Sequence, residues 1–185
     1  WFAGSACLSP TRSIGPMSLI ALEDSWAFAV GDSVHLTAPG RAIKTFELNH
    51  AISEMRIWEA ASQTRIGICV PDRHQILIGP TQVSVFGHLD WPFTIGSAPT
   101  AVGIKADQEP GAFFYPLSFD VGPDGRIFVL DSGNARIVVF DRLGKAVTQW
   151  GGFGNAPGEF NFGLGRQIPG GDLDFGGSVA LDEEG

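Results

Sequence analysis

Short apolar runs alternate with turn residues along this chain, and the pattern is densest between residues 109 and 152. Two runs, at 127–130 and 137–140, consist of β-branched, aliphatic or aromatic residues only. Runs of this length between turn residues are typical of strands that are buried on both faces. Gly and Asn in the turns tolerate the left-handed backbone that a tight reversal needs. The segment therefore predicts a meander with strands at 117–121, 126–131, 136–140 and 145–150.

An acidic and a basic residue face each other across one turn of this meander. Asp131 ends the second predicted strand, Asn134 lies in the turn, and Arg136 begins the third strand. A carboxylate–guanidinium contact between Asp131 and Arg136 would fix the register of the two strands. We interpret the three residues as a structural clasp, and a role in binding a ligand is the alternative.

The same alternation occurs twice earlier in the chain. The first meander has expected strands at 18–22, 26–30, 34–37 and 42–48, and the second has them at 55–59, 65–70, 75–78 and 82–86. Corresponding strands of these two units lie about 40 residues apart, which is the length of a propeller repeat. The step to the third unit is about 60 residues, so we interpret residues 87–109 as an insertion.

The third meander resembles the NHL repeat. The resemblance rests on Gly111, Phe113, Pro116, the turn at 122–125, the segments 127–134 and 136–140, Gly144 and the pair at 150–151. It implies a four-stranded blade of a circular β-propeller, a fold used mostly by interaction modules and by a few enzymes. We therefore expect an all-β fold, a partial β-propeller of about three four-stranded antiparallel blades plus the first strand of a fourth.

The domain organisation follows from these repeats. Residues 1–16 carry little periodicity and are expected to form an extended lead-in to one propeller domain at 17–185. Its blades are expected at about 17–48, 55–87 and 111–152. Residues 111–125 align with 171–185 at an offset of 60, so a fourth blade is expected to begin there, with its first strand at 178–182. Three blades and one strand do not close a ring, so we expect further residues to complete it.

Two long loops are expected on one face of the propeller, at 87–109 and 153–170. Both join the last strand of one blade to the first strand of the next, which places them beside the turn at 131–134. Long loops on a rigid scaffold frequently carry binding residues, and aromatic and Arg side chains are favoured at protein interfaces. The candidates for partner binding are Trp91, Phe93, Phe153, Asn155, Phe160, Phe162 and Arg166. The alternative is that these side chains only fix the loops to the blades.

Composition and charge narrow the range of partners. The net charge of −8 argues against nucleic acid, because phosphate binding needs a basic surface. No apolar run approaches the length of a membrane span. The acidic charge and the small residues before Cys7 favour a periplasmic or extracellular location. Lipidation of Cys7 and a Cys7–Cys69 disulfide are left open, although Cys69 lies in an apolar run that predicts a buried thiol.

The sequence offers little sign of catalytic chemistry. The four histidines, His35, His50, His74 and His88, share no metal-ligand spacing, and no nucleophile elbow or phosphate loop is present. We predict no catalytic residue, metal or cofactor. The expected function is a non-catalytic protein-interaction scaffold or accessory subunit of a larger assembly, with a small ligand not excluded. The alternative is a propeller enzyme, such as a metal-dependent lyase or hydrolase, whose site lies partly in further blades.

Overall fold

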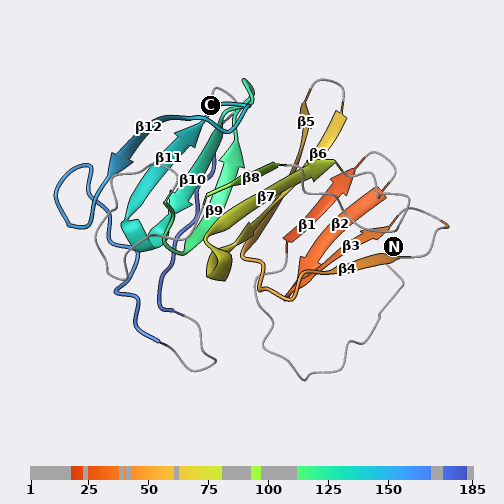
Figure 1. Ribbon diagram of the computed structural model, residues 1–185, viewed down its shortest axis with the longest axis horizontal. Helices are drawn as coiled ribbons and strands as arrows, with labels where there is room; N and C mark the ends of the chain where they lie inside the picture. The colour runs from red at the N-terminus through yellow and green to blue at the C-terminus, as the bar shows by residue number, and fades with distance from the viewer. Residues whose placement is uncertain are drawn as a thin grey trace.

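The computed structural model describes residues 18–22, 25–37, 40, 43–60, 63–80, 93–96, 112–167 and 173–182. These residues form three four-stranded antiparallel sheets, and within each sheet the strands are ordered as they follow one another in the chain (Figure 1). The first sheet comprises β1 (Ser18–Leu22), β2 (Ser25–Val30), β3 (Ser33–Thr37) and β4 (Lys44–Glu47). The second comprises β5 (Glu54–Ala60), β6 (Gln63–Val70), β7 (Gln75–Pro80) and β8 (Phe93–Ile95). The third comprises β9 (Pro116–Val121), β10 (Ile127–Asp131), β11 (Arg136–Phe140) and β12 (Ala146–Gly151).

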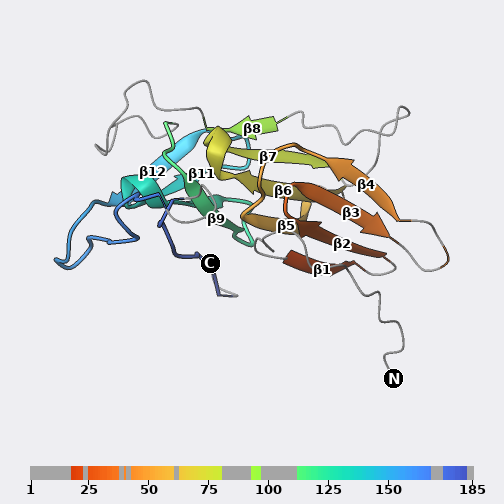
Figure 2. The ribbon, with the colours of Figure 1, turned by 90° about the horizontal axis from the view of Figure 1, so that it is seen from below.

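The three sheets are arranged as consecutive blades of a propeller. Figure 2 shows the first strands β1, β5 and β9 along one side of the molecule and the fourth strands β4, β8 and β12 along the opposite side. Two 3-10 turns, η1 (Pro71–Arg73) and η2 (Ser132–Asn134), join the second and third strands of the second and third sheets. Both turns lie at the same end of their sheets (Figure 1), which is one face of the propeller disc. The expected all-β, partial-propeller fold is confirmed.

Two apolar cores hold the sheets together. Met55, Ile66 and Ile68 on the second sheet pack with Ala29 and Val34 on the first. Because successive side chains of a strand point to opposite faces, the alternate residues of β6 and β7 face the third sheet instead.

The core between the second and third sheets contains Cys69, Ile76, Phe119, Val129 and Val138, among others. The second sheet thus buries both of its faces. This explains why residues 66–70 form a continuous apolar run rather than an alternating one.

The outermost strand of the second sheet differs from the expectation. We expected residues 82–86 at this position, but β8 (Phe93–Ile95) pairs with β7 in the register Ile76↔Ile95. Ile95 is buried in the core against the third sheet, and this burial favours the pairing of β8 with β7. Residues 81–92 lie outside the described part of the chain. The expected loop at 87–109 therefore contains a strand.

Residues 173–182 return along the third sheet. They form no β-ladder with a described strand, although two of their amides bond to side chains on β9. Figure 1 shows this segment running back beside the third sheet toward the C-terminus. Among the described residues, no helix has the length and apolar character needed to cross a membrane.

Candidate interaction face

The turn between β10 and β11 is held by a buried ion pair. Nε of Arg136 donates to Oδ2 of Asp131 at 2.8 Å, and Nδ2 of Asn134 donates to the same oxygen at 2.8 Å. Oδ1 of Asp131 accepts the backbone amide of Phe114 at 2.8 Å. Burial raises the pKa of the Asp131 carboxyl, while the bonds from Asn134, Phe114 and Arg136 favour its charged form.

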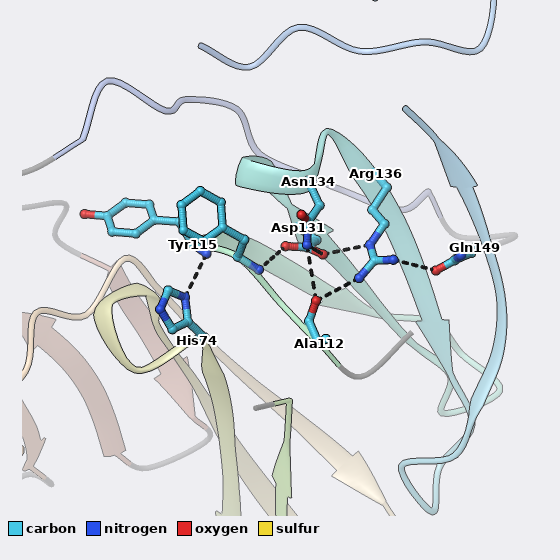
Figure 3. Close-up of polar contacts among 8 residues, drawn as sticks. His74, Ala112, Tyr115, Asp131, Asn134, Arg136 and Gln149 are labelled. Carbon is cyan, nitrogen blue, oxygen red and sulfur yellow. Dashed lines mark hydrogen bonds and ion pairs between the residues drawn. The ribbon is translucent and has the colours of Figure 1, made fainter. Parts of the chain in front are cut away.

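The same group of residues also fixes the chain that enters the third sheet. The guanidinium of Arg136 donates to the Ala112 carbonyl at 2.9 Å and to Oε1 of Gln149 at 3.0 Å, as Figure 3 shows. Asn134 donates to the Ala112 carbonyl as well, at 3.2 Å. Asp131, Asn134 and Arg136 thus connect the entering segment, the η2 turn and β12. The polar atoms that make these bonds are therefore occupied by partners within the protein.

The corresponding turn of the second sheet is built differently. Val70 and Gln75 occupy the positions that Asp131 and Arg136 occupy in the third sheet, on either side of η1. His74 follows η1 in the left-handed conformation, with φ of 56°, as Ala135 follows η2 with φ of 51°. Instead of a buried ion pair, the turn uses Nδ1 of His74, which accepts the backbone amide of Tyr115 at 3.0 Å.

Aromatic rings gather beside His74. The imidazole stacks on Phe114 with ring centroids 5.7 Å apart, and Phe175 contacts both Phe114 and Tyr115 at 5.8 and 5.7 Å. Figure 3 shows the Tyr115 ring pointing away from the clasp. Burial lowers the pKa of His74, while the Asp72 carboxylate acts in the opposite direction. The cluster therefore joins η1, the start of β9 and the returning C-terminal segment.

A contact between a glycine and a phenylalanine ring occurs at the end of the outermost strand in both the second and the third sheet. A Cβ atom on Gly151, the last residue of β12, would lie 2.8 Å from the Ala135 carbonyl oxygen and 2.8 Å from the Phe160 ring. Gly96, after β8, has the same relation to the His74 carbonyl and to Phe113. Because φ is positive at both glycines, a side chain would be strained there as well as crowded. Phe160 is thus the third-sheet counterpart of Phe113.

The loop after β12 is held in place by backbone hydrogen bonds. The Gly152 amide donates to the Ala135 carbonyl at 2.8 Å, which fixes the loop beside η2. The Phe160 amide donates to the Gly152 carbonyl at 2.8 Å, and Oε2 of Glu159 accepts the Ala156 amide at 2.9 Å. The loop therefore lies on the face of the disc that carries η1 and η2.

Residues 162–167 are paired with residues 173–176. Arg166 and Asp174 bond in both directions: the Asp174 amide donates to the Arg166 carbonyl at 2.9 Å, and Oδ1 of Asp174 accepts the Arg166 amide at 2.6 Å. The Gly176 amide donates to the Phe162 carbonyl at 2.7 Å. These bonds hold residues 162–166 and 174–176 beside each other.

The candidate residues for partner binding separate into two groups. The side chains of Phe153, Asn155 and Arg166 are exposed, and Phe153 has 56% of its surface accessible. Phe160 and Phe162 are half-buried and stack on each other with centroids 5.2 Å apart.

The contacts of Phe160 and Phe162 match the alternative in which aromatic residues only fix the loop. Phe160 packs on Gly151, and Phe162 packs on Gly177. The two remaining candidates come from the first long loop. Trp91 lies outside the described residues, and Phe93 belongs to β8.

Sequence reasoning missed part of this face. Leu164 is 44% exposed on the same loop, and its apolar side chain next to Gly163 and Gly165 was a usable signal. The contact between His74 and Tyr115 joins residues 41 positions apart, so no local pattern could reveal it. In the part of the chain that the structure describes, no three His, Cys, Asp or Glu side chains gather as a metal site would require.

Comparison with known proteins gives one family and two structural likenesses. Residues 113–140 match the family described as the NHL repeat. No curated protein matches the chain. The N-terminal part of BBS1 in complex with ARL6 is 14% identical, with a TM-score of 0.49 over 77% of this chain and 41% of that one. An auxiliary nutrient binding protein from Bacteroides thetaiotaomicron is 17% identical, with a TM-score of 0.49 over 75% of this chain and 36% of its own.

This chain spans less than half the length of either of those structures. The matched residues run from Phe113 through the clasp to Phe140 at the end of β11. They include Asp131, Asn134 and Arg136, which form the buried ion pair and hydrogen bonds at the η2 turn. The chain thus has an all-β, propeller-like fold in which residues 113–140, from just before β9 to the end of β11, match the NHL repeat.

Proposed function

We propose that this protein is a non-catalytic, NHL-type propeller that binds another protein, as a scaffold or accessory subunit of a larger assembly. The proposed contact surface is the loop after β12, on the face that carries η1 and η2. The observation that carries the proposal is the exposure of Phe153 and Leu164 on a loop whose backbone is hydrogen-bonded at Gly152, Phe160 and Phe162. An apolar side chain held outward by a rigid loop loses little conformational entropy on binding.

The polar neighbours of these side chains fit a protein partner. Asn155 and Arg166 are exposed on the same loop, and Arg is among the residues favoured at protein interfaces. Apolar anchors surrounded by polar residues are the usual composition of a specific interface. The first long loop is not needed for this proposal, because its described residues belong to β8 and the glycine that follows it.

A capture experiment with a matched control tests the proposal. The tagged protein, isolated from its native source, would be compared with the double variant Phe153→Ser/Leu164→Ser and with Leu143→Ser. Leu143 is 76% exposed but lies in the turn between β11 and β12, on the opposite face of the disc.

We expect the double variant to lose its co-purified partner at unchanged thermal stability, and Leu143→Ser to retain it. Equal recovery of partner by all three proteins would contradict the proposal. Loss in both variants would instead point to nonspecific adhesion of exposed apolar side chains.

The proposed place of action is the periplasm or the extracellular space. The support for it is the acidic net charge of −8 and the small residues that precede Cys7. Fractionation of native cells would test it, since recovery of the protein with the cytoplasmic fraction would contradict an exported location.

A further inference from the structure

β9 carries two polar side chains on the side along which the C-terminal segment returns. Oγ of Ser118 accepts the Val179 amide at 3.1 Å, and Oδ2 of Asp120 accepts the Leu181 amide at 2.8 Å. The two donors are two residues apart, and so are the two acceptors. This is the spacing of two extended chains whose alternate groups point toward each other. Side-chain acceptors on β9 thus take the place of a backbone ladder.

Asp120 also contacts the second sheet. Its Oδ1 lies 3.4 Å from Nε of Arg56 on β5, and the guanidinium of Arg56 pairs in addition with Glu54. Oδ1 further accepts the Val121 amide at 2.9 Å. One carboxylate therefore meets β5, its own strand and the returning segment.

These contacts fix the register between neighbouring units, which hydrogen bonds within the sheets do not do. β5 and β9 are first strands of different sheets and exchange no ladder hydrogen bonds. Apolar packing between neighbouring blades is non-directional, so it opposes separation far better than it opposes sliding along the strand. Directional bonds at a two-residue spacing determine one register, and bonds to a carboxylate are stronger than neutral ones.

We propose that Ser118 and Asp120 are positioning residues for the next unit of the propeller. They hold residues 179–181 extended along the inner edge of the third sheet in a single register, and Asp120 connects that register to β5 through Arg56. The inference goes beyond the proposed binding function, because these residues lie on the inner strand and not on the loop that carries Phe153.

Residue-resolved hydrogen exchange of the whole chain tests the proposal. In Asp120→Ala the Leu181 amide should exchange about tenfold faster, because it loses a charged acceptor. In Ser118→Ala the amide that exchanges faster should be that of Val179. In Asp120→Asn the Leu181 amide should remain protected, since an amide oxygen can still accept its hydrogen bond.

Asp141→Ala is the matched control. It removes a carboxylate of the same sheet that accepts the amides of Leu143 and Lys145, so only these two amides should exchange faster. Unchanged exchange of Leu181 in Asp120→Ala would overturn the proposal, and so would a uniform increase over the whole third sheet. If Asp120→Ala does not fold, Ser118→Ala tests the proposal instead. Unchanged exchange of the Val179 amide in that variant would also overturn the proposal. Partner capture is expected to be unaffected by either variant, so this test and that of the binding face fail independently.

Discussion

Nε of Arg136 lies 2.8 Å from Oδ2 of Asp131, and the two side chains are 4% and 0% exposed. The exposed pair of Arg126 and Asp124 in the same sheet has almost the same Nε–Oδ2 distance, 2.7 Å. The two contacts thus join the same chemical groups at almost the same distance but differ in solvation. This difference decides how much each contributes to the stability of the third sheet.

Removal of Arg136 should be strongly destabilising. Arg136→Ala leaves the Asp131 carboxylate buried without its cation, and breaking a buried pair in this way costs about 3–5 kcal/mol. Arg126→Ala breaks an exposed pair and should cost less than about 1 kcal/mol. Urea denaturation of both variants measures the two free energies of unfolding. Similar decreases in the free energy of unfolding in the two variants would show that burial does not increase the contribution of the Asp131–Arg136 pair to stability.

Phe160 and Phe153 should respond differently to truncation. Phe160 packs on Gly151 and Phe162, so Phe160→Ala should lower the free energy of unfolding by about 2 kcal/mol. Phe153 is mostly exposed, and Phe153→Ala should change that free energy by less than about 0.5 kcal/mol. Thermal and urea unfolding check both values. A larger loss from Phe153→Ala would mean that this side chain supports the fold.

Stability should fall in mild acid because of His74. Nδ1 of His74 accepts the Tyr115 amide, so the ring must be neutral at that nitrogen, and burial lowers its pKa from the usual 6.5. The unfolded chain therefore binds a proton at a higher pH than the folded protein does. The contribution of His74 is fully present above the unfolded pKa and is lost as the pH falls below it.

Urea denaturation between about pH 8 and about pH 5 measures this loss. His74→Gln lacks the titrating group and should lose less stability over the same range. His35, His50 and His88 are present in both proteins, so the difference isolates His74. An identical pH profile for the two proteins would refute this assignment.

The thiol of Cys69 should be unreactive in the folded protein. It is fully buried, donates to the Pro116 carbonyl at 3.1 Å, and has its pKa raised by burial to about 12. Cys69 is a free cysteine, not a disulfide partner. In a Cys7→Ser variant, a thiol reagent at neutral pH should therefore label the protein only as fast as it unfolds. Rapid labelling under native conditions would contradict the burial of this side chain.

The candidate site could be predicted only in part. The clasp was accessible to sequence reasoning because Asp131, Asn134 and Arg136 lie within six consecutive positions around one turn. The alignment of 178–182 with the start of β9 predicted the first strand of a fourth blade, whereas in the structure these residues form no strand and two of their amides bond to side chains on β9. The aromatic candidates were chosen by residue type, and residue type does not distinguish the exposed Phe153 from the half-buried Phe160.

The sequence by itself determined the local structure of this protein. Apolar runs, turn residues and repeat spacing specify strands and hairpins, since these depend on neighbours a few positions apart. Only the tertiary structure decided which residues meet across units. It placed Ile95 in the second core, Tyr115 on His74, and Asp120 between Arg56 and Leu181. The contacts of Tyr115 and Asp120 join residues 41 to 64 positions apart in the chain and arise when the sheets pack, so no local pattern encodes them.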